Sequence, residues 1–439
     1  MAKQIIIKGT AVTGANEVLV ADSNSKIPAV DGSLVTAMSG TNVGSGTIAT
    51  ARLDTGTAAN KIVVLDGSAK IPAVDGSLLT GIVSYTKSAS DPTVSTNPSG
   101  GVGTEWVNTS TGKQFICTDA TAGANVWSCS GSHSGDIQPW ILQGSSYGYM
   151  VGNTGSTPTS GVIQKYSFTS DGDSTAAGSL IGTGQYGGTE HSTASHGYYC
   201  QAWDGTRIER WTFASDGSGV DTTQDLTLNT WYAGSAQTAT YGYTMGGTHA
   251  PPSTSTDMIQ KYQFDTSNNG TDVGNLTVVT NSGGGHSSAT HGYSSGGTTY
   301  TGSPAVYLNI ISKTTFSSDA NATDVGDLIL GNYFPAYSSS TTDGYCSGGY
   351  YHPTTTYANT IQKFSFSSDG NSTDLGDLTQ TGHTGGSSQS TTHGYQAGGQ
   401  NAGGRINRIE KYQFDTSNNA TQVGILTTGH SYGPGGCQI

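Results

Sequence analysis

The sequence predicts an all-β fold, because three kinds of residue recur along it in one order and at one spacing. A Gly-Tyr pair, a Phe and a Leu each appear six times, at intervals of 45 to 52 residues. Compositional bias does not keep three different residues in register, so the chain contains a repeated structural unit. Tyr is also abundant, with 23 residues, and like Thr and Val it suits half-buried strands. The recurring residues are Gly148, Gly197, Gly242, Gly292, Gly344 and Gly394; Phe168, Phe213, Phe264, Phe316, Phe366 and Phe414; and Leu180, Leu226, Leu276, Leu328, Leu378 and Leu426.

The composition limits the classes of protein to consider. The chain has 439 residues, enough for two or more domains, of which 11% are charged and 33% hydrophobic. A chain so rich in Gly, Ser and Thr can be disordered, but disorder does not require Phe and Leu at fixed offsets. The net charge is −13, from 17 basic and 30 acidic residues, and there is no basic stripe. We therefore expect no nucleic-acid partner.

The beginning of the chain gives no sign of export. The apolar run within residues 1–8 is too short for a secretory signal peptide. No segment approaches the ~18–20 apolar residues that span a bilayer, so we expect no membrane insertion. These features predict synthesis in the cytoplasm without a signal peptide.

Residues 1–83 contain a duplication of their own. The nine residues 26–34 return unchanged as residues 70–78, and each copy follows a short β-rich run. The segment has too few bulky side chains to enclose a core by itself. Such segments usually gain stability by intertwining with other chains. We therefore expect a β-rich attachment and oligomerisation stalk, in a protein that forms a homo-oligomer.

Residues 84–136 have the pattern of a small β meander. Three short strands are predicted at residues 106–108, 113–117 and 125–129, with turn residues between them. Cys117 and Cys129 flank the second turn, and a disulfide across it would be worth ~3 kcal/mol. Two unpaired thiols are the alternative, because cytosolic synthesis disfavours disulfides.

Residues 137–439 hold the six repeats, and each repeat divides into four strand-like pieces. In the last copy these are residues 388–391, 393–397, 409–414 and 422–426. The third piece carries apolar bulk on both faces, as expected of a strand between two other sheets. Six four-stranded sheets arranged radially meet that requirement, so we expect a six-bladed β-propeller. Residues 430–433 either begin a seventh copy or complete the first blade.

The order of the pieces resembles the kelch repeat, over roughly residues 140–430. A Ser-rich strand precedes a Tyr strand that ends in Gly-Gly, and a third strand ends in Tyr-x-Phe. The first two copies depart from the doublet, with Gly152-Asn153 and Gln201-Ala202 in its place. The Trp usual before the fourth kelch strand is replaced by Gly-x-Leu. The doublets are Gly246-Gly247, Gly296-Gly297, Gly348-Gly349 and Gly398-Gly399.

The front of the chain is similar to the N-terminal parts of bacteriophage tail fibres and related virion appendages. The similarity rests on the duplicated segment, on the Trp-containing meander that follows it, and on the layout of an attachment segment before an adhesive domain. It implies a virion protein made in the host cytoplasm. Residues 1–83 would then contact other virion proteins, and the propeller would contact a host surface glycan or protein.

Two patterns raise the question of a bound metal. Residues 170–173 and 368–374 place oxygen side chains at a spacing like that of calcium loops, but they lack the EF-hand layout. Asp-Gly pairs are also what tight turns need, and we favour that interpretation. Histidines recur at two repeat positions, where packing or a hydrogen bond between blades is the alternative to a metal in a central channel. We expect no cofactor and no metal. The histidines are His191, His286 and His383, and His196, His291 and His393.

The most variable part of each repeat is the link between its second and third strands. In a propeller such links emerge on one rim, where a rigid scaffold presents loops for recognition. Tyr, Asn, Ser and Gly, which dominate these links, are also typical of adaptable recognition loops. The alternative is that the tyrosines only cover blade edges. The candidate receptor-binding residues are Tyr300, Tyr307, Tyr350, Tyr351, His352, Tyr357 and Arg405.

Catalytic patterns are missing from the sequence. It contains no Gly-x-Ser-x-Gly, no His-Glu-x-x-His and no phosphate-binding glycine loop that leads into a helix. We therefore expect a protein that is not an enzyme, and specifically an adhesin that binds a receptor, most simply a glycan, through propeller loops. A structural decoration or connector of the virion is one alternative. An enzyme acting on surface polysaccharide is the other.

Overall fold

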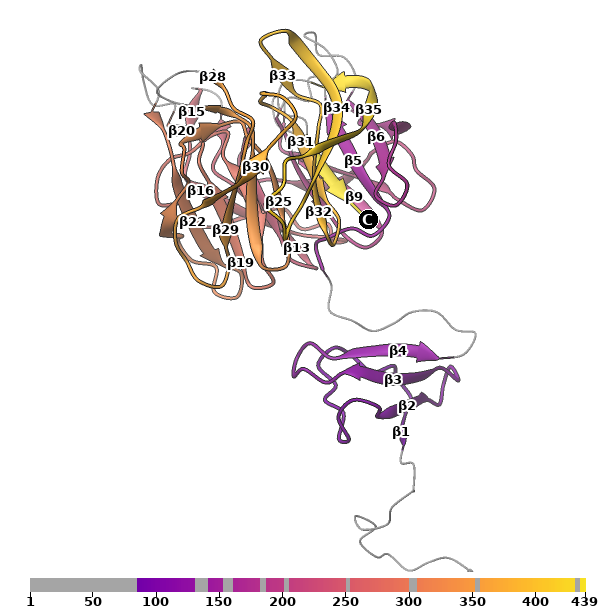
Figure 1. Cartoon of the computed structure of the whole chain (residues 1–439). Helices are drawn as coiled ribbons and strands as arrows, with labels where there is room; N and C mark the ends of the chain where they lie inside the picture. The colour runs from indigo at the N-terminus through magenta and orange to yellow at the C-terminus, as the bar shows by residue number, and fades with distance from the viewer. Residues whose placement is uncertain are drawn as a thin grey trace, which may run out of the picture. The chain divides into compact units, whose positions relative to one another are not determined.

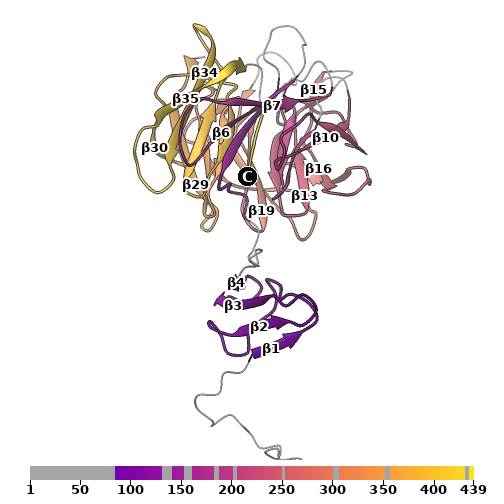
Figure 2. The same cartoon turned by 90° about the vertical axis from the view of Figure 1, so that its right-hand side faces the viewer.

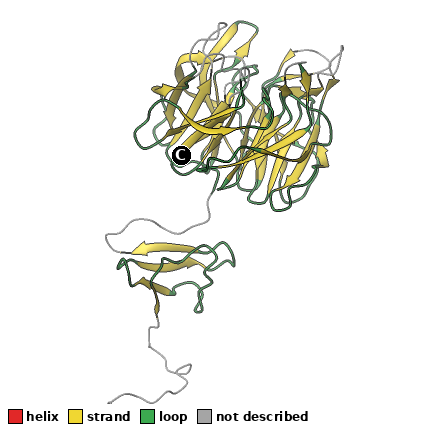
Figure 3. Ribbon diagram, turned by 180° about the vertical axis from the view of Figure 1, so that it is seen from behind, coloured by secondary structure: helices red, strands yellow, loops and turns green. Residues whose placement is uncertain are grey.

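A computed structural model gives the fold of most of the chain after residue 84. The predicted stalk, residues 1–83, lies outside the part that it describes. Within the described part the secondary structure is all-β, as predicted, and contains no helix (Figure 3). No helix long and apolar enough to cross a membrane is therefore found there. The described residues are 85–130, 141–152, 161–181, 187–200, 205–249, 253–299, 306–351, 356–430 and 435–439.

The meander is a four-stranded sheet in the order β1-β2-β3-β4. The three predicted strands are present as β2, β3 and β4, while the short polar strand β1 was not predicted. Phe115, Cys117 and Trp127 form its core. Cys117 and Cys129 form no disulfide with each other: Cys117 lies opposite Trp127 in the ladder, and Cys129 lies opposite Phe115. The strands are β1 (Tyr85–Ser88), β2 (Glu105–Asn108), β3 (Gln114–Asp119) and β4 (Val126–Ser130).

The repeats form six antiparallel sheets, which we number 1 to 6 (Figure 1). Sheet 1 consists of β36 (Gly435–Gln438), β5 (Tyr147–Gly152), β6 (Val162–Ser167) and β7 (Thr175–Ser179), in that order. Sheet 2 consists of β8 (Thr189–Ser192), β9 (His196–Cys200), β10 (Arg207–Thr212) and β11 (Val220–Asp225). Sheet 3 consists of β12 (Gly234–Gln237), β13 (Tyr241–Met245), β16 (Met258–Gln263) and β17 (Thr271–Asn275). Sheet 4 consists of β18 (Gly284–Ser287), β19 (His291–Ser295), β22 (Ile310–Thr315) and β23 (Thr323–Asp327). Sheet 5 consists of β25 (Ala336–Ser339), β26 (Asp343–Ser347), β29 (Thr360–Ser365) and β30 (Thr373–Asp377). Sheet 6 consists of β31 (Gly386–Gln389), β32 (His393–Ala397), β34 (Gly404–Gln413) and β35 (Thr421–His430).

The first strands of the sheets lie next to one another. Contacts join β8 to β12, β12 to β18, β18 to β25, β25 to β31, β31 to β36, and β36 back to β8. Each first strand therefore touches one in each of two neighbouring sheets. β36 comes from the C-terminal end of the chain, yet it pairs with β5, with Cys437 opposite Tyr149. The strand that completes the first sheet is thus Gly435–Gln438. Of residues 430–433, for which two alternatives were open, His430 ends β35 and residues 431–433 lie outside the described residues.

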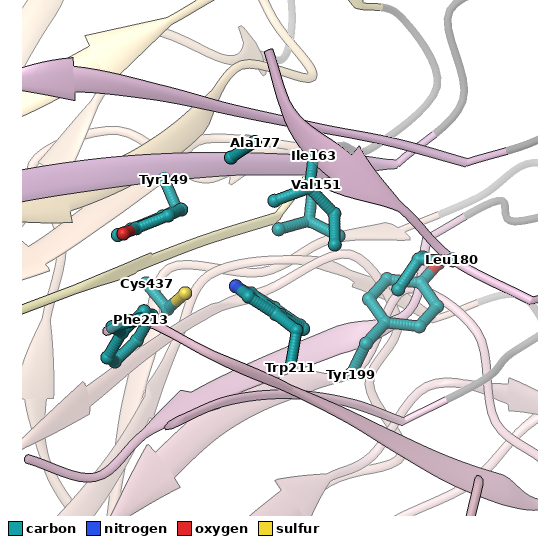
Figure 4. Close-up of a cluster of buried hydrophobic side chains, with 9 residues drawn as sticks. All are labelled: Tyr149, Val151, Ile163, Ala177, Leu180, Tyr199, Trp211, Phe213 and Cys437. Atoms are coloured by element: carbon teal, nitrogen blue, oxygen red, sulfur yellow. The ribbon is translucent and has the colours of Figure 1, made fainter. Parts of the chain in front are cut away.

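The repeated Tyr and Phe meet between sheets. The Tyr on the second strand of each sheet packs against the Phe that follows the third strand of the next sheet, with ring centroids 4.6 to 4.8 Å apart in all six pairs. Figure 4 shows the first pair in the core between sheets 1 and 2. The last pair joins sheet 6 to sheet 1. The six pairs are Tyr149–Phe213, Tyr198–Phe264, Tyr243–Phe316, Tyr293–Phe366, Tyr345–Phe414 and Tyr395–Phe168.

The Gly-x-Leu motif has a steric reason. A Cβ at Gly326 would lie 2.3 Å from the carbonyl oxygen of Gly370, in the turn of the next sheet, and a Cβ at Gly178 would lie 2.1 Å from that of Gly217. No side chain fits such a close backbone approach, so a Trp near this point would force the sheets apart. Five copies have the Gly, and the second has Gln224 in its place. The Leu is at most 5% exposed in all six copies.

Candidate binding surface

Short hairpins extend sheets 3 to 6 beyond their second and third strands. Figure 1 places β15, β20, β28 and β33 at one end of the sheets, which we call the rim, and Figure 2 shows β15 at the same end. In sheets 3 to 6 the variable links between the second and third strands therefore lie at this rim. The hairpins are β14 (Thr248–His249) with β15 (Thr254–Ser255), β20 (Thr298–Thr299) with β21 (Val306–Tyr307), β27 (Tyr350–Tyr351) with β28 (Thr356–Tyr357), and β33 (Gln400–Asn401) with the start of β34.

The structure places five of the seven candidate residues. Tyr307, Tyr350, Tyr351 and Tyr357 are half-buried on the rim hairpins, and Arg405 is exposed on β34. Backbone hydrogen bonds of 2.9 Å in both directions join Gln400, which pairs with Arg405, to His383. Tyr300 and His352 lie outside the described residues.

Three of these tyrosines belong to a larger set of half-buried rings, which we call the aromatic cluster. Tyr357 stacks on His383 with centroids 5.0 Å apart and an interplanar angle of 14°. Tyr350 lies 5.1 Å from Tyr357 and 5.8 Å from His383. The ring of Phe334 joins His383 to Tyr333, and Tyr333 in turn lies next to Tyr307. Its members are Tyr232, Tyr307, Tyr333, Phe334, Tyr350, Tyr357 and His383.

Four members of the cluster were not predicted as binding residues. Tyr232, Tyr333, Phe334 and His383 precede the first strands of their sheets, whereas the sequence reasoning considered only the links after the second strands. A signal was present: Tyr232 and Phe334 each stand two residues before a first strand.

The loops that carry Tyr232 and Phe334 are tied together by their backbones. The N–H of Tyr232 donates to Gly187, that of Ser282 to Tyr232, that of Phe334 to Ser282, and that of Thr384 to Phe334, over 2.6 to 3.0 Å. The four donor residues all have φ between 55° and 59°. This region costs a bulky residue ~1–3 kcal/mol, so the surrounding contacts must hold it there. Residues held in such strain are typical of binding sites, and here they fix two rings of the cluster.

Two of the recurring histidines, His191 and His286, make side-chain hydrogen bonds between sheets. His191 donates through Nε2 to the carbonyl of Tyr243, at 3.0 Å, and accepts at Nδ1 from the hydroxyl of Tyr262. His286 donates through Nδ1 to the carbonyl of Ser338, at 3.1 Å. Burial lowers the pKa of both imidazoles to about 4, so they are neutral at pH 7. Within the described ranges no group of three or more His, Cys, Asp or Glu is placed to hold a metal ion.

The Asp-rich turns form ion pairs. Five of the six third strands carry a Lys or Arg that pairs with the Asp in the turn of the next sheet, at 2.5 to 2.9 Å. In sheet 5, Lys363 pairs instead with Asp343, at 3.3 Å. The turn interpretation of these aspartates is therefore supported, since φ is positive at four of the five. The pairs are Lys165–Asp216, Arg210–Asp265, Lys261–Asp319, Lys313–Asp369 and Lys411–Asp171.

The sequence was compared with protein-family models and with curated proteins. No protein-family model matches the sequence, and no relative was found among curated proteins.

Proposed function

We propose that the six sheets form a six-bladed, kelch-like β-propeller that carries a receptor-binding rim. Three observations support a closed ring: the first strands contact one another in a cycle, all six Tyr–Phe pairs are present, and Lys411 of sheet 6 pairs with Asp171 of sheet 1. The chain end supports it too, because β36 completes sheet 1. The pairing of the last strand with the first sheet joins the two ends of the row of sheets by backbone hydrogen bonds.

The function that the rim supports best is binding of a surface glycan. The observation that carries this proposal is the aromatic cluster, seven half-buried rings drawn from four sheets and held partly in strained backbone. Aromatic faces stack on the apolar faces of sugar rings, while their polar edges bond hydroxyl groups. Tyr contributes this area at a low entropy cost, because it has only two side-chain torsions. The net charge of −13 favours neutral sugars over acidic ones.

The wider role that we propose is that of a virion adhesin. This part of the proposal rests on the similarity of the front of the chain to tail-fibre proteins. Residues 1–83 would attach the chain to other virion proteins and join it into a homo-oligomer, and the rim would then contact the host surface. Several rims on one particle would compensate for weak binding by each.

The test uses the full chain and two variants. The labelled protein is applied to a microarray of purified bacterial surface polysaccharides. We expect wild type to bind at least one polysaccharide, and Tyr357→Ala, which removes the ring stacked on His383, to weaken binding about tenfold or more. Tyr147→Ala is the matched control, because Tyr147 is a 39% exposed tyrosine at the start of β5, away from the rim hairpins.

The outcomes separate the three functional hypotheses. Equal binding by wild type and Tyr357→Ala would remove the rim from the proposal. No binding to any polysaccharide, with normal melting of the protein, would favour the structural role in the virion. Shortening of a bound polysaccharide, measured by size-exclusion chromatography, would show an enzyme.

A further inference from the structure

The first strands of the six sheets line a cavity of about 30 Å³. An adjoining cavity of about 40 Å³ is lined mainly by the residues that precede the first strands of sheets 2 to 6. Glu190 on β8 and Tyr337 on β25 line both of them. One water molecule needs ~10–15 Å³ of such space. Each cavity is therefore the size of a small hydrated ion or of a few water molecules.

The smaller cavity is lined by one equivalent residue from every sheet. Each of these residues pairs with the residue that follows Gly-Tyr on the second strand, so all six occupy one level. Five of them are uncharged at pH 7, and the sixth is a glutamate. A second level, two residues further along each strand, consists only of Ser and Gln. The residues at the first level are Glu190, Ser235, Gly285, Tyr337, Ser387 and Gly436.

Glu190 is buried without compensation. It is 3% exposed, and neither carboxylate oxygen has a hydrogen-bond partner on another residue of the described part of the chain. The other two buried glutamates are satisfied. Glu209 accepts from the backbone N–H of Ile181 at 2.8 Å, and Glu410 accepts from that of Thr379 at 3.1 Å. Glu190 alone directs an unused carboxylate into a cavity.

The groups that face Glu190 supply no positive charge. No Lys or Arg is among the residues that line either cavity. His286 lines the smaller one, but burial lowers its pKa to about 4. Burial raises the pKa values of Tyr199, Tyr337 and Cys437, which also feel the charge of Glu190, so they are neutral at pH 7. Burial likewise raises the pKa of Glu190 well above its ordinary value, and its own backbone amide opposes this only weakly.

We propose that the smaller cavity binds one hard metal cation. The Glu190 carboxylate is its charged ligand, and the hydroxyls of Ser235 and Tyr337 are among its neutral oxygen ligands. Ser235 and Tyr337 already lie within 3.2 Å of each other, oxygen to oxygen. Carboxylate and hydroxyl oxygens suit Ca²⁺ and Na⁺ rather than soft metals. The cation neutralises the buried carboxylate and links sheets 2, 3 and 5 at the centre of the molecule. This role differs from receptor binding, although Tyr232 and Phe334 of the aromatic cluster line the larger of the two cavities.

The experiment measures melting of the full chain at constant ionic strength in choline chloride, NaCl or CaCl₂. At ten times its dissociation constant, the cation raises the melting temperature of wild type by about 2 °C over choline chloride. Comparison of the two metal salts identifies the ion. Glu190→Gln keeps the shape and removes the charge, so it melts equally in all three salts. Glu410→Gln, the matched control, changes a buried glutamate outside the cavities and keeps the response to the cation.

A second measurement does not depend on a variant that folds. Equilibrium dialysis of wild type against CaCl₂ or NaCl, with metal content read by mass spectrometry, should give one bound ion per chain at pH 8. Binding should weaken as the pH falls, because protons then compete for Glu190. Equal melting of wild type in all three salts, or no stoichiometric ion at pH 8, would overturn the proposal. A salt response that survives in Glu190→Gln would also overturn it.

Discussion

Substitution of Phe168 distinguishes a closed ring from an open row of sheets. Phe168 belongs to sheet 1 and lies 4.6 Å from Tyr395 of sheet 6, with the ring of Tyr166 6.1 Å away and edge-on. Phe366 has nearly the same surroundings inside the row: Tyr293 lies 4.7 Å from it, and Phe364 lies 5.8 Å away, also edge-on. Both phenylalanines are partly buried. The two sites differ mainly in whether the contact joins the ends of the row.

In a closed ring Phe168→Ala and Phe366→Ala should destabilise equally. A buried Phe→Ala change costs ~3–5 kcal/mol, and partial burial places both variants near the lower figure, at about 3 kcal/mol. The assay is urea unfolding of the full chain, followed by tryptophan fluorescence. The two variants are compared when the free energy of unfolding depends on urea concentration with the same slope in both. If Phe168→Ala costs less than about half of what Phe366→Ala costs, the face of sheet 1 is open and the ring closure is wrong.

Two further predictions concern stability. Gly326→Ala should destabilise by at least ~1–3 kcal/mol, because its Cβ would strike the carbonyl of Gly370. Gly217→Ala, with a similar φ of 148° and no atom within 4 Å of its Cβ, should cost less in the same urea assay. The buried His191 and His286 have pKa values of about 4 when folded, below the ~6.5 of the unfolded chain. Each histidine makes its full contribution to the free energy of unfolding above pH 6.5 and loses it as the pH falls towards 4. At pH 5 the loss is about 2 kcal/mol per histidine. His286→Gln should therefore flatten the fall in unfolding free energy between pH 7 and pH 5.

The sequence predicts the scaffold well, because the scaffold repeats. Gly-Tyr, Phe and Leu kept their register, and the structure uses all three in contacts between neighbouring sheets. Strand boundaries were less certain: in the last copy the first strand is Gly386–Gln389, two residues earlier than predicted. Its Ser-rich sequence has no apolar alternation to fix the register, so only the pairing with β32 sets its position.

Groups that act across sheets were harder to predict. The stacking of Tyr357 on His383 joins residues from two sheets, and no spacing along the chain indicates it. Glu190 has the same difficulty, because an acid in a polar strand looks ordinary until the other first strands surround it. Repeats reveal what every copy shares, whereas a site is built from the positions at which copies differ.

The Gly-Gly doublets explain which of the described sheets carry a rim hairpin. In sheets 3 to 6 both glycines have positive φ, 63° to 69° at the first and 91° to 103° at the second. This turn leads the second strand into a rim hairpin. In three sheets the N–H of the second glycine also donates to a loop of the next sheet, as Gly349 does to Gly382 at 2.8 Å. The first two copies lack the doublet, and the described parts of sheets 1 and 2 carry no such hairpin. The doublet therefore occurs in the same four sheets that carry the described rim hairpins, sheets 3 to 6, where we propose that binding takes place.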